Sequence, residues 1–324
     1  MASYLLTRLG QALLVMLVMS VLVFAGVYAI GNPLHILIPP DATQADIARL
    51  AASLGLDQPL WRQYLTFLEQ AVRGNLGVSF AFNVPAIRLV MERLPATLEL
   101  AVAASAIALV FGIPLGLWAG LKPRSAAGRL IDAGSLLGFS LPTFFVGLLL
   151  VMGFSVLLGW LPAGGRGPTR ELFGIEVSFL SLDGLRHLVL PAANLALFKL
   201  ALIIRLTRSG TREALTHDYV RFARSKGLTE RRVIGVHVLK NILIPIVTVA
   251  GLEFGSLIAF AVVTETIFAW PGMGKLLIDS INTLDRPVIV AYLCVTVLIF
   301  VFINLLVDIA YALLDPRVRA GFAT

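Results

Sequence analysis

Six long apolar runs constrain this chain more than any other feature of its sequence. They cover approximately residues 9–30, 97–121, 130–158, 187–207, 243–265 and 287–313. A helix needs roughly 20 mostly apolar residues to cross the hydrocarbon core of a bilayer, and every run is long enough to do so. The charged fraction of 14% is also far below the value of about 25% that is usual in soluble domains. The sequence therefore predicts an all-α membrane protein with six transmembrane helices.

The distribution of Lys and Arg predicts how these helices are oriented. An even number of spans places both termini on one side, and that side would carry 15 of the 26 Lys and Arg residues, against 10 on the other. Lys and Arg accumulate in cytoplasmic loops, so both termini are predicted to be cytoplasmic. The net charge of +7 then reflects orientation, and nucleic acid is not an expected partner. The first apolar run is too long for a signal-peptide core, which predicts an uncleaved first helix.

The segment between the first two runs is predicted to be a small helical insertion on the extracytoplasmic side. Ile47, Leu50, Ala51 and Leu54 keep helical spacing, and a second such pattern follows Pro59. Two short amphipathic helices are expected there. The predicted parts of the chain are the N-terminus with the first transmembrane helix (1–30), the extracytoplasmic helical loop (31–96) and a five-helix core (97–324) that contains a cytoplasmic loop (208–242).

No motif for catalysis or for nucleotide binding is present in the sequence. The chain lacks G-x-S-x-G and H-E-x-x-H, and its four histidines are scattered. Gly274-Lys275 is followed by Leu276 rather than Ser or Thr, so a Walker A phosphate loop is excluded. We expect no enzyme activity, cofactor or metal in this chain. A secondary transporter is an alternative function, although the inverted repeat expected of one is not apparent, and a six-span protease would need the missing serine motif.

The most polar stretch of the chain, DYVRFARSKGLTERRVIGVH, lies between the fourth and fifth apolar runs. Asp218 is a suitable N-cap residue and Gly227 a suitable C′ residue, which predicts a helix over 219–226 of about 12 Å, too short to span a membrane. Tyr219, Phe222 and Ala223 follow i, i+3, i+4 spacing and should share one face. The helix could dock a cytoplasmic partner through aromatic and Arg side chains. It could also lie on anionic lipid.

This stretch resembles the EAA-type loop of ATP-binding-cassette importer permeases of the dipeptide/oligopeptide/nickel branch. The residues that match the pattern of that branch are Asp218, Tyr219, Val220, Arg221, Ala223, Arg224, Lys226, Gly227, Leu228, Val233, His237, Leu239, Asn241 and Pro245. Arg221 stands where the wider family has Glu. Six further stretches resemble the same branch in order along the chain: 55–60, 74–77, 93–100, 141–145, 264–272 and 315–319.

The resemblance implies a type I importer permease fold, in which the chain forms half of a pore in a bacterial inner membrane. The implied partners are a second homologous permease, two ATPase subunits that hold ATP and Mg, an extracytoplasmic solute-binding protein and membrane lipid. The implied ATPase-coupling residues are Asp218, Tyr219, Arg221, Phe222, Ala223, Arg224, Lys226, Gly227 and Leu228. The solute stays open among dipeptides, oligopeptides, nickel chelates, glutathione and opines.

Charged residues inside the apolar runs are costly and indicate candidate functional positions. Lys199 and Glu253 lie at similar depths in neighbouring antiparallel runs and are expected to pair, unless Lys199 pairs with Asp308 of the last run. These residues and Glu265 are candidates for the translocation pathway, although Lys199 could instead extend to the surface. Trp270, Pro271 and Gly272 are candidates for an outer gate or a binding-protein contact, with anchoring at the membrane interface as the alternative.

Overall fold

The computed structural model describes residues 2–29, 43–53 and 55–314 of the chain, and most of their backbone is helical. The segment 315–319, which contributed to the resemblance, lies outside this part. The helices in order are α1 (Ala2–Ala29), α3 (Gln44–Ser53), α4 (Leu60–Val72), α5 (Ala86–Leu121), α6 (Ala126–Ser140), α7 (Thr143–Leu150), α8 (Leu182–Ala214), α9 (Asp218–Ser225), α10 (Glu230–Arg232), α11 (Leu239–Ile267), α12 (Met273–Asn282) and α13 (Arg286–Leu314), with π-helical turns η1 (Val151–Leu157) and η2 (Val233–Val238).

One short hairpin departs from the all-α prediction. Strands β1 (Arg170–Leu172) and β2 (Ile175–Val177) pair antiparallel, with Leu172 opposite Ile175. The two residues between them, Phe173 and Gly174, both have positive φ, 52° and 81°. This is the backbone of a two-residue hairpin turn whose twist matches that of the strands. Helical periodicity could not predict it, because each strand has only three residues.

The helices that are long and apolar enough to cross a membrane include α5, α8, α13 and the continuous segment Glu230–Ile267. The bent pair Ala126–Ser140 and Thr143–Leu157 adds a fifth candidate if it forms one span. In the first apolar run, the apolar stretch Gly10–Gly26 of α1 is shorter than these helices and is not counted among them. Four to five spans thus follow from the described residues, and the sixth stays a prediction.

The third apolar run is not the single continuous helix that the sequence suggested. It breaks between Ser140 and Thr143, and the two halves are bent by 111°. The break lies at Leu141-Pro142, where Leu141 has the extended angles φ −84° and ψ 134°. Proline has no N–H to continue the hydrogen-bond ladder, and its ring disfavours helical geometry in the preceding residue. Pro142 therefore ends α6 and starts α7, whereas prolines within α5, α8 and α11 are accommodated inside those helices.

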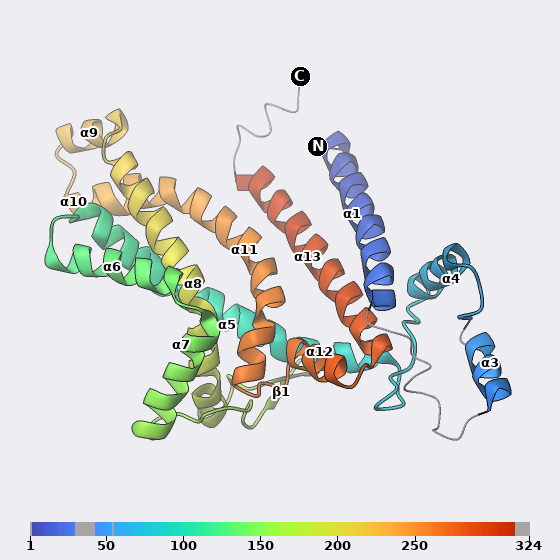
Figure 1. Ribbon diagram of the computed structural model, residues 1–324. Coiled ribbons are helices and arrows are strands. Elements are labelled where there is room, and N and C mark those ends of the chain that lie inside the picture. Colours follow the sequence, from blue (N-terminus) through green and yellow to red (C-terminus); the bar gives the residue numbers. More distant parts are fainter. Residues whose placement is uncertain (1, 30–42, 54, 315–324) are drawn as a thin grey trace. The chain divides into compact units, whose positions relative to one another are not determined.

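By its contacts the chain divides into two units, Met1–Leu94 with Gly272–Val301 and Pro95–Pro271 with Phe302–Thr324. In the second unit, α8 is the central helix and packs against α6, α7 and α11 (Figure 1). Three glycines one turn apart on α5 allow close contact with α8. A Cβ atom at Gly116 would lie 2.6 Å from the backbone oxygen of Ile204, and one at Gly120 would lie 2.7 Å from Thr211. Small residues at such spacing let membrane helices approach backbone to backbone.

The first unit contains the two helices predicted for the insertion, and both are present as α3 and α4. Helix α4 packs against α1, where Tyr64 shares a 2.8 Å hydrogen bond with Ser20 and its ring lies 5.4 Å from that of Phe24. In the same unit, buried Asp285 accepts backbone N–H groups of Phe80 and Ala81 and the hydroxyl of Ser79. These contacts fix the segment after α4 to the start of α13. The side of the membrane on which they lie stays a prediction.

Candidate functional site

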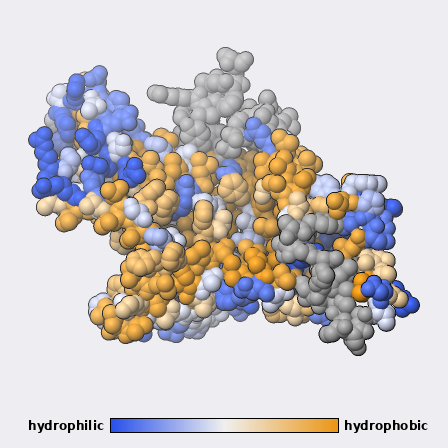
Figure 2. Space-filling model, viewed as in Figure 1, coloured by the Kyte–Doolittle hydropathy of each residue, from blue (hydrophilic) through white to orange (hydrophobic). Residues whose placement is uncertain are grey.

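Helix α9 is fixed to the second unit by one buried edge. Val220 and Ala223, one turn apart, are buried in an apolar cluster with Val233 and Val238 of η2 and Ile242 of α11. Apart from Tyr219 and Phe222, the other residues of α9 are polar, and Figure 2 shows a hydrophilic surface over α9 and α10 beside the apolar surface of the longer helices. A movement of α9 as a rigid body would therefore be transmitted to α11 through packed side chains.

The exposed side of α9 carries the aromatic residue expected there, but the predicted face needs correction. Phe222 is 61% exposed and Tyr219 is 38% exposed, whereas Ala223 is buried. Ala223 faces inward because it forms an i, i+3 pair with Val220, an apolar residue that the predicted face omitted. Lys226 lies 4.5 Å from the centre of the Phe222 ring, and Tyr219 stacks on His217. An aromatic side chain within a basic surface is thus presented outward.

The ends of α9 lie close to the predicted positions. Gly227 has φ +76°. Its N–H donates to the carbonyl of Arg224 at 2.9 Å, and the N–H of Leu228 donates to the carbonyl of Ala223 at 3.4 Å. These are the two hydrogen bonds of a Schellman C-cap, as Gly at this position predicted. The N-cap prediction is wrong by one residue: His217 occupies that position and Asp218 is the first helical residue. Asp218 still lies in the first turn of α9, where the positive end of the helix dipole stabilises a carboxylate.

An exposed ion pair links α9 to α10. Nε and Nη2 of Arg224 donate to the two carboxylate oxygens of Glu230 at 2.8 and 3.2 Å. The hydrogen bonds from Arg224 lower the pKa of Glu230 and raise the pKa of Arg224. Because folding lowers the pKa of Glu230, the ion pair stabilises the folded state at pH values above the ordinary pKa of a Glu side chain. This stabilisation is lost as the pH falls through the lowered pKa of the folded state. Both side chains are solvated, so this stabilisation is small.

Inside the apolar part of the second unit, Lys199 of α8 pairs with Glu253 of α11. Nζ of Lys199 donates to the Glu253 carboxylate and, at 2.7 Å, to the hydroxyl of Ser256. Ser256 also lies 3.0 Å from the same carboxylate. Lys199 is buried, so it does not extend to the surface. Of the two partners that the sequence offered for Lys199, Glu253 is therefore the one in contact with it. Asp308 lies in α13, and its side chain is outside the described part of the structure.

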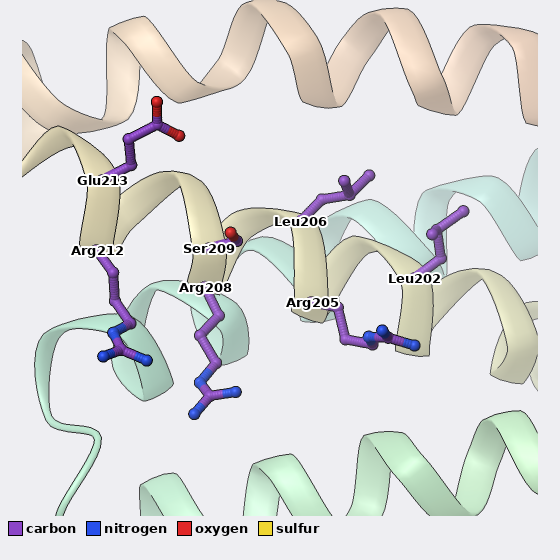
Figure 3. A pocket seen from close by; sticks show the side chains of 7 residues that line it. All are labelled: Leu202, Arg205, Leu206, Arg208, Ser209, Arg212 and Glu213. Atoms are coloured by element: carbon purple, nitrogen blue, oxygen red, sulfur yellow. The ribbon is translucent and has the colours of Figure 1, made fainter.

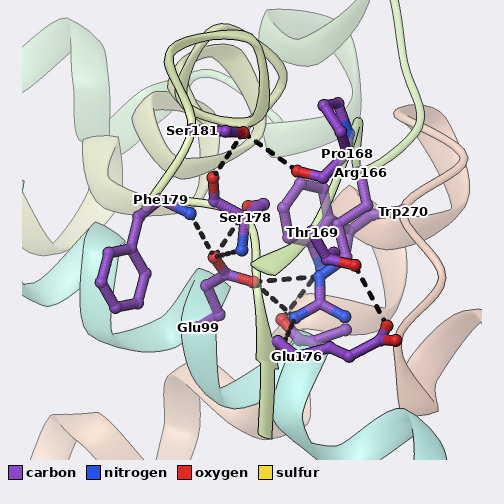
Figure 4. A network of polar contacts seen from close by, with 10 residues as sticks. Glu99, Arg166, Pro168, Thr169, Glu176, Ser178, Phe179, Ser181 and Trp270 are labelled. Atoms are coloured by element: carbon purple, nitrogen blue, oxygen red, sulfur yellow. Dashed lines mark hydrogen bonds and ion pairs between the residues drawn. The ribbon is translucent and has the colours of Figure 1, made fainter. Parts of the chain in front are cut away.

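A larger buried network, which the sequence did not predict, surrounds Glu99 of α5 (Figure 4). One oxygen of Glu99 accepts two hydrogen bonds from Arg166, at 2.7 and 3.0 Å. The other oxygen accepts the N–H and hydroxyl of Ser178, both at 2.7 Å, and the N–H of Phe179 at 3.0 Å. Arg166 also donates to the backbone carbonyl of Glu176 in β2. This network fixes the segments before and after the β1–β2 hairpin to α5.

The end of α11 is also fixed to α5. Thr97 donates to the carboxylate of Glu265 at 2.6 Å, and the indole Nε1–H of Trp270 donates to the carbonyl of Ala96 at 2.9 Å. Glu265 and Trp270 are fully buried. The Trp270 side chain is therefore unavailable for anchoring at the membrane interface or for direct contact with a binding protein, because it is used to hold this turn. Pro271 and Gly272 continue the chain from it toward α12.

Sequence reasoning missed Glu99 although a signal was available. Glu99 lies inside the predicted span 97–121, so the rule that identified Lys199 and Glu253 also applied to it. Its partners Arg166 and Ser178 lie 67 and 79 positions further along the chain. They fall in a loop for which no fold was predicted, so only the tertiary structure could identify them.

The sequence was compared with known protein families. The family described as "Binding-protein-dependent transport system inner membrane component" matches residues 112–320, and its separate N-terminal family matches residues 1–101. This chain belongs to that family. It is thus a permease subunit of a bacterial ATP-binding-cassette importer, an inner-membrane component that acts with ATPase subunits and a solute-binding protein. Permeases of this family are not themselves the ATPases.

Several curated permeases are similar over almost their whole length. The "Di/tripeptide transport system permease protein DppB" of Pseudomonas aeruginosa is 41% identical, with 98% of this chain and 99% of the relative covered. The "Dipeptide transport system permease protein DppB" of Escherichia coli is 38% identical with the same coverage. The "Oligopeptide transport system permease protein AppB" of Bacillus subtilis is 38% identical, with 98% and 100% covered. The predicted branch of importer permeases is confirmed.

Among solved structures, the MetNI methionine ABC transporter in an inward-facing conformation has a similar fold. The TM-score is 0.53 at 14% identity, and the match covers 70% of this chain and 96% of the other. The permease therefore has the importer fold that the sequence predicted.

Proposed function

We propose that this permease imports di- or oligopeptides, and that it forms half of a pore with a second homologous permease. The peptide assignment is supported by the three relatives, which are named for peptide transport and match over 98% of the chain. In this proposal two ATPase subunits bind ATP and Mg and drive the cycle. Both termini are cytoplasmic, and α3 and α4 form the extracytoplasmic insertion.

The coupling role is supported by one observation: α9 is buried along one edge and exposed on the opposite side. One edge, Val220 and Ala223, is buried against η2 and α11, and the opposite side presents Phe222. A helix attached to the transmembrane core by apolar packing and presenting an aromatic anchor suits a docking element, since aromatic and Arg side chains dominate interface energies. Closure of the ATPases would then move α9 and α11 together. A helix that only rests on lipid would need no such attachment.

Uptake of labelled peptides tests this proposal. The chain is expressed with its neighbouring subunits, and uptake of di-, tri- and longer peptides is measured with an intact and with a hydrolysis-deficient ATPase. Peptide uptake that requires ATP hydrolysis is the expected result. Uptake that persists with the inactive ATPase would favour a secondary transporter, and ATP-dependent uptake of another solute class would replace peptides as the substrate.

The Lys199–Glu253 pair gives a prediction for the translocation pathway. If the pair contacts the solute, the double variant Lys199→Met/Glu253→Gln, which leaves no unpaired charge, should express normally and lose at least about tenfold in uptake, a change of roughly 1.4 kcal/mol. Each single variant should also reduce expression, since it leaves one charge without its partner. Uptake per molecule is compared with that of the exposed-pair variant Lys275→Met/Asp279→Asn. Normal uptake by the Lys199–Glu253 double variant would show that the pair is structural.

A further inference from the structure

Three arginines form a stripe on one side of α8, near its C-terminal end. Arg205, Arg208 and Arg212 are spaced i, i+3 and i+7 and line a hollow of about 750 Å³. Figure 3 shows the three guanidinium groups on one side of α8 and Glu213 on the other. Lys199 lies nine residues before Arg208, which is half a turn away around the helix. The hollow is therefore separate from the Lys199–Glu253 pair.

Helix α6 lies opposite the arginines, whereas the residues that line the hollow itself all belong to α8. Arg208 pairs with Asp132 at 2.8 Å, and the guanidinium of Arg205 lies 5.6 Å from the centre of the Phe139 ring. Leu136 lies between these two contacts on the same stripe of α6, at i+4 from Asp132 and i−3 from Phe139. Its side chain is 64% exposed. The arginines thus face a wall that is acidic at one end and apolar along the rest.

The hydrogen-bonding capacity of the stripe is largely unused. Arg205 and Arg212 form no hydrogen bond or ion pair with any residue in the described part of the chain. The Nε atom of Arg208 is buried and has no acceptor there either. Guanidinium groups donate to planar or tetrahedral oxyanions through paired N–H groups. Asp132 faces the arginines and Glu213 also lines the hollow, so two negative charges stand against three positive ones, and the remaining positive charge suits an anionic ligand.

The expected position of the arginines in the membrane and the exposed leucines of α6 indicate which anion binds. Arg205 lies at the end of the apolar run 187–207, and Arg212 lies about 10 Å further along the helix axis, which spans the headgroup region. Leu136, Leu137 and Leu130 of α6 are all more than half exposed and require an apolar cover. A free inorganic anion would satisfy the arginines alone, whereas a phospholipid supplies both a phosphodiester and acyl chains. Basic hollows between helices on the cytoplasmic side are suited to such headgroups.

We propose that the hollow along α8, where its arginines face α6, binds the phosphodiester headgroup of an anionic phospholipid, with Arg205, Arg208 and Arg212 as donors and an acyl chain along Leu136 of α6. The bound lipid would hold α6, the first half of the broken third run, against α8. This site goes beyond the transport proposal and does not depend on which solute is carried.

Lipid binding is measured directly on the full-length chain purified with its partner subunits. Phosphatidylglycerol and phosphatidylcholine are titrated, and bound lipid is counted by native mass spectrometry. Phosphatidylglycerol should bind roughly tenfold more tightly than phosphatidylcholine. Arg205→Gln/Arg212→Gln should weaken its binding by roughly 30-fold, because each arginine near a lipid phosphate contributes a fewfold to tenfold. Arg231→Gln, which removes an exposed charge from α10, is the matched control.

The double variant should fold and assemble normally, since neither side chain has a polar partner to lose. Equal binding of the two lipids, or equal losses in the double variant and in Arg231→Gln, would overturn the proposal. Displacement of phosphatidylglycerol by millimolar inorganic phosphate would identify a site for free phosphate instead. Peptide uptake is measured in parallel. If the lipid prediction fails and uptake is normal, the lipid site is rejected while the proposed transport function is retained.

Discussion

Replacing Phe222 with Asp should prevent the ATPase subunits from co-purifying with the permease. Phe222 is 61% exposed, and its backbone is fixed by the burial of Val220 and Ala223. Aromatic anchors of this kind contribute 2 kcal/mol or more to an interface, so we expect a loss of at least roughly 30-fold in affinity. A carboxylate would add the cost of placing a charge in an apolar pocket of the partner. ATP-driven uptake should fall below detection.

The matched control places the same substitution at another exposed aromatic residue. Phe173, at the tip of the β1–β2 hairpin, is 96% exposed and has φ 52°, a backbone angle that Asp adopts more readily than Phe. Phe173→Asp should leave ATPase co-purification unchanged. Thermal melting of both variants checks that the fold is intact. If Phe222→Asp retains a normal amount of ATPase, α9 is not the main docking element, and the alternative in which it rests on anionic lipid gains support.

Replacing Glu99 with Ala should have the largest effect on stability. The substitution removes the acceptor of five hydrogen bonds and leaves the guanidinium of Arg166, only 11% exposed, without its carboxylate. Breaking a buried ion pair by removing one partner costs about 3–5 kcal/mol. This is a large part of the total stability of a typical domain, about 5–15 kcal/mol. We therefore expect a large fall in the yield of folded protein and a lower melting temperature.

Glu92→Ala on the same helix is the control for Glu99→Ala. Glu92 pairs with Arg88 at the surface, and its loss should cost less than about 1 kcal/mol. The double variant Glu99→Leu/Arg166→Met, which buries no charge, should recover part of the stability that Glu99→Ala loses. A melting temperature of Glu99→Ala equal to that of Glu92→Ala would show that the network contributes little to folding.

Features that depend on local chemistry were largely predictable. Gly227 indicated the end of α9 because only a residue that tolerates positive φ closes a helix in this way, and the two Schellman hydrogen bonds are present. Counting residues along two antiparallel helices, whose rise per residue is fixed, indicated Glu253 as a partner of Lys199 beside the alternative Asp308, and the structure shows the pair with Glu253. The N-cap was displaced by one residue, from Asp218 to His217, which is within the usual uncertainty of helix ends.

Features that depend on distant partners were not predictable. Prolines lie in several of the apolar runs, but the sequence did not indicate that Pro142 would end a helix whereas Pro191 would lie inside one. The same limit applies to the face of α9, where Val233 and Val238 of η2 decide that Ala223 is buried while Phe222 is exposed.

The sequence by itself determined that the chain is a helical membrane protein of the importer permease family. The length of the apolar runs, the distribution of Lys and Arg, and the order of the motifs can all be obtained from the sequence without knowledge of the fold. Only the tertiary structure decided that Glu99, Arg166 and Ser178 form one network and that Arg205, Arg208 and Arg212 line one hollow with α6. The physical reason is that folding brings together side chains that are far apart in the sequence, and a buried charge such as Glu99 is tolerated only where its partner then lies within hydrogen-bonding distance.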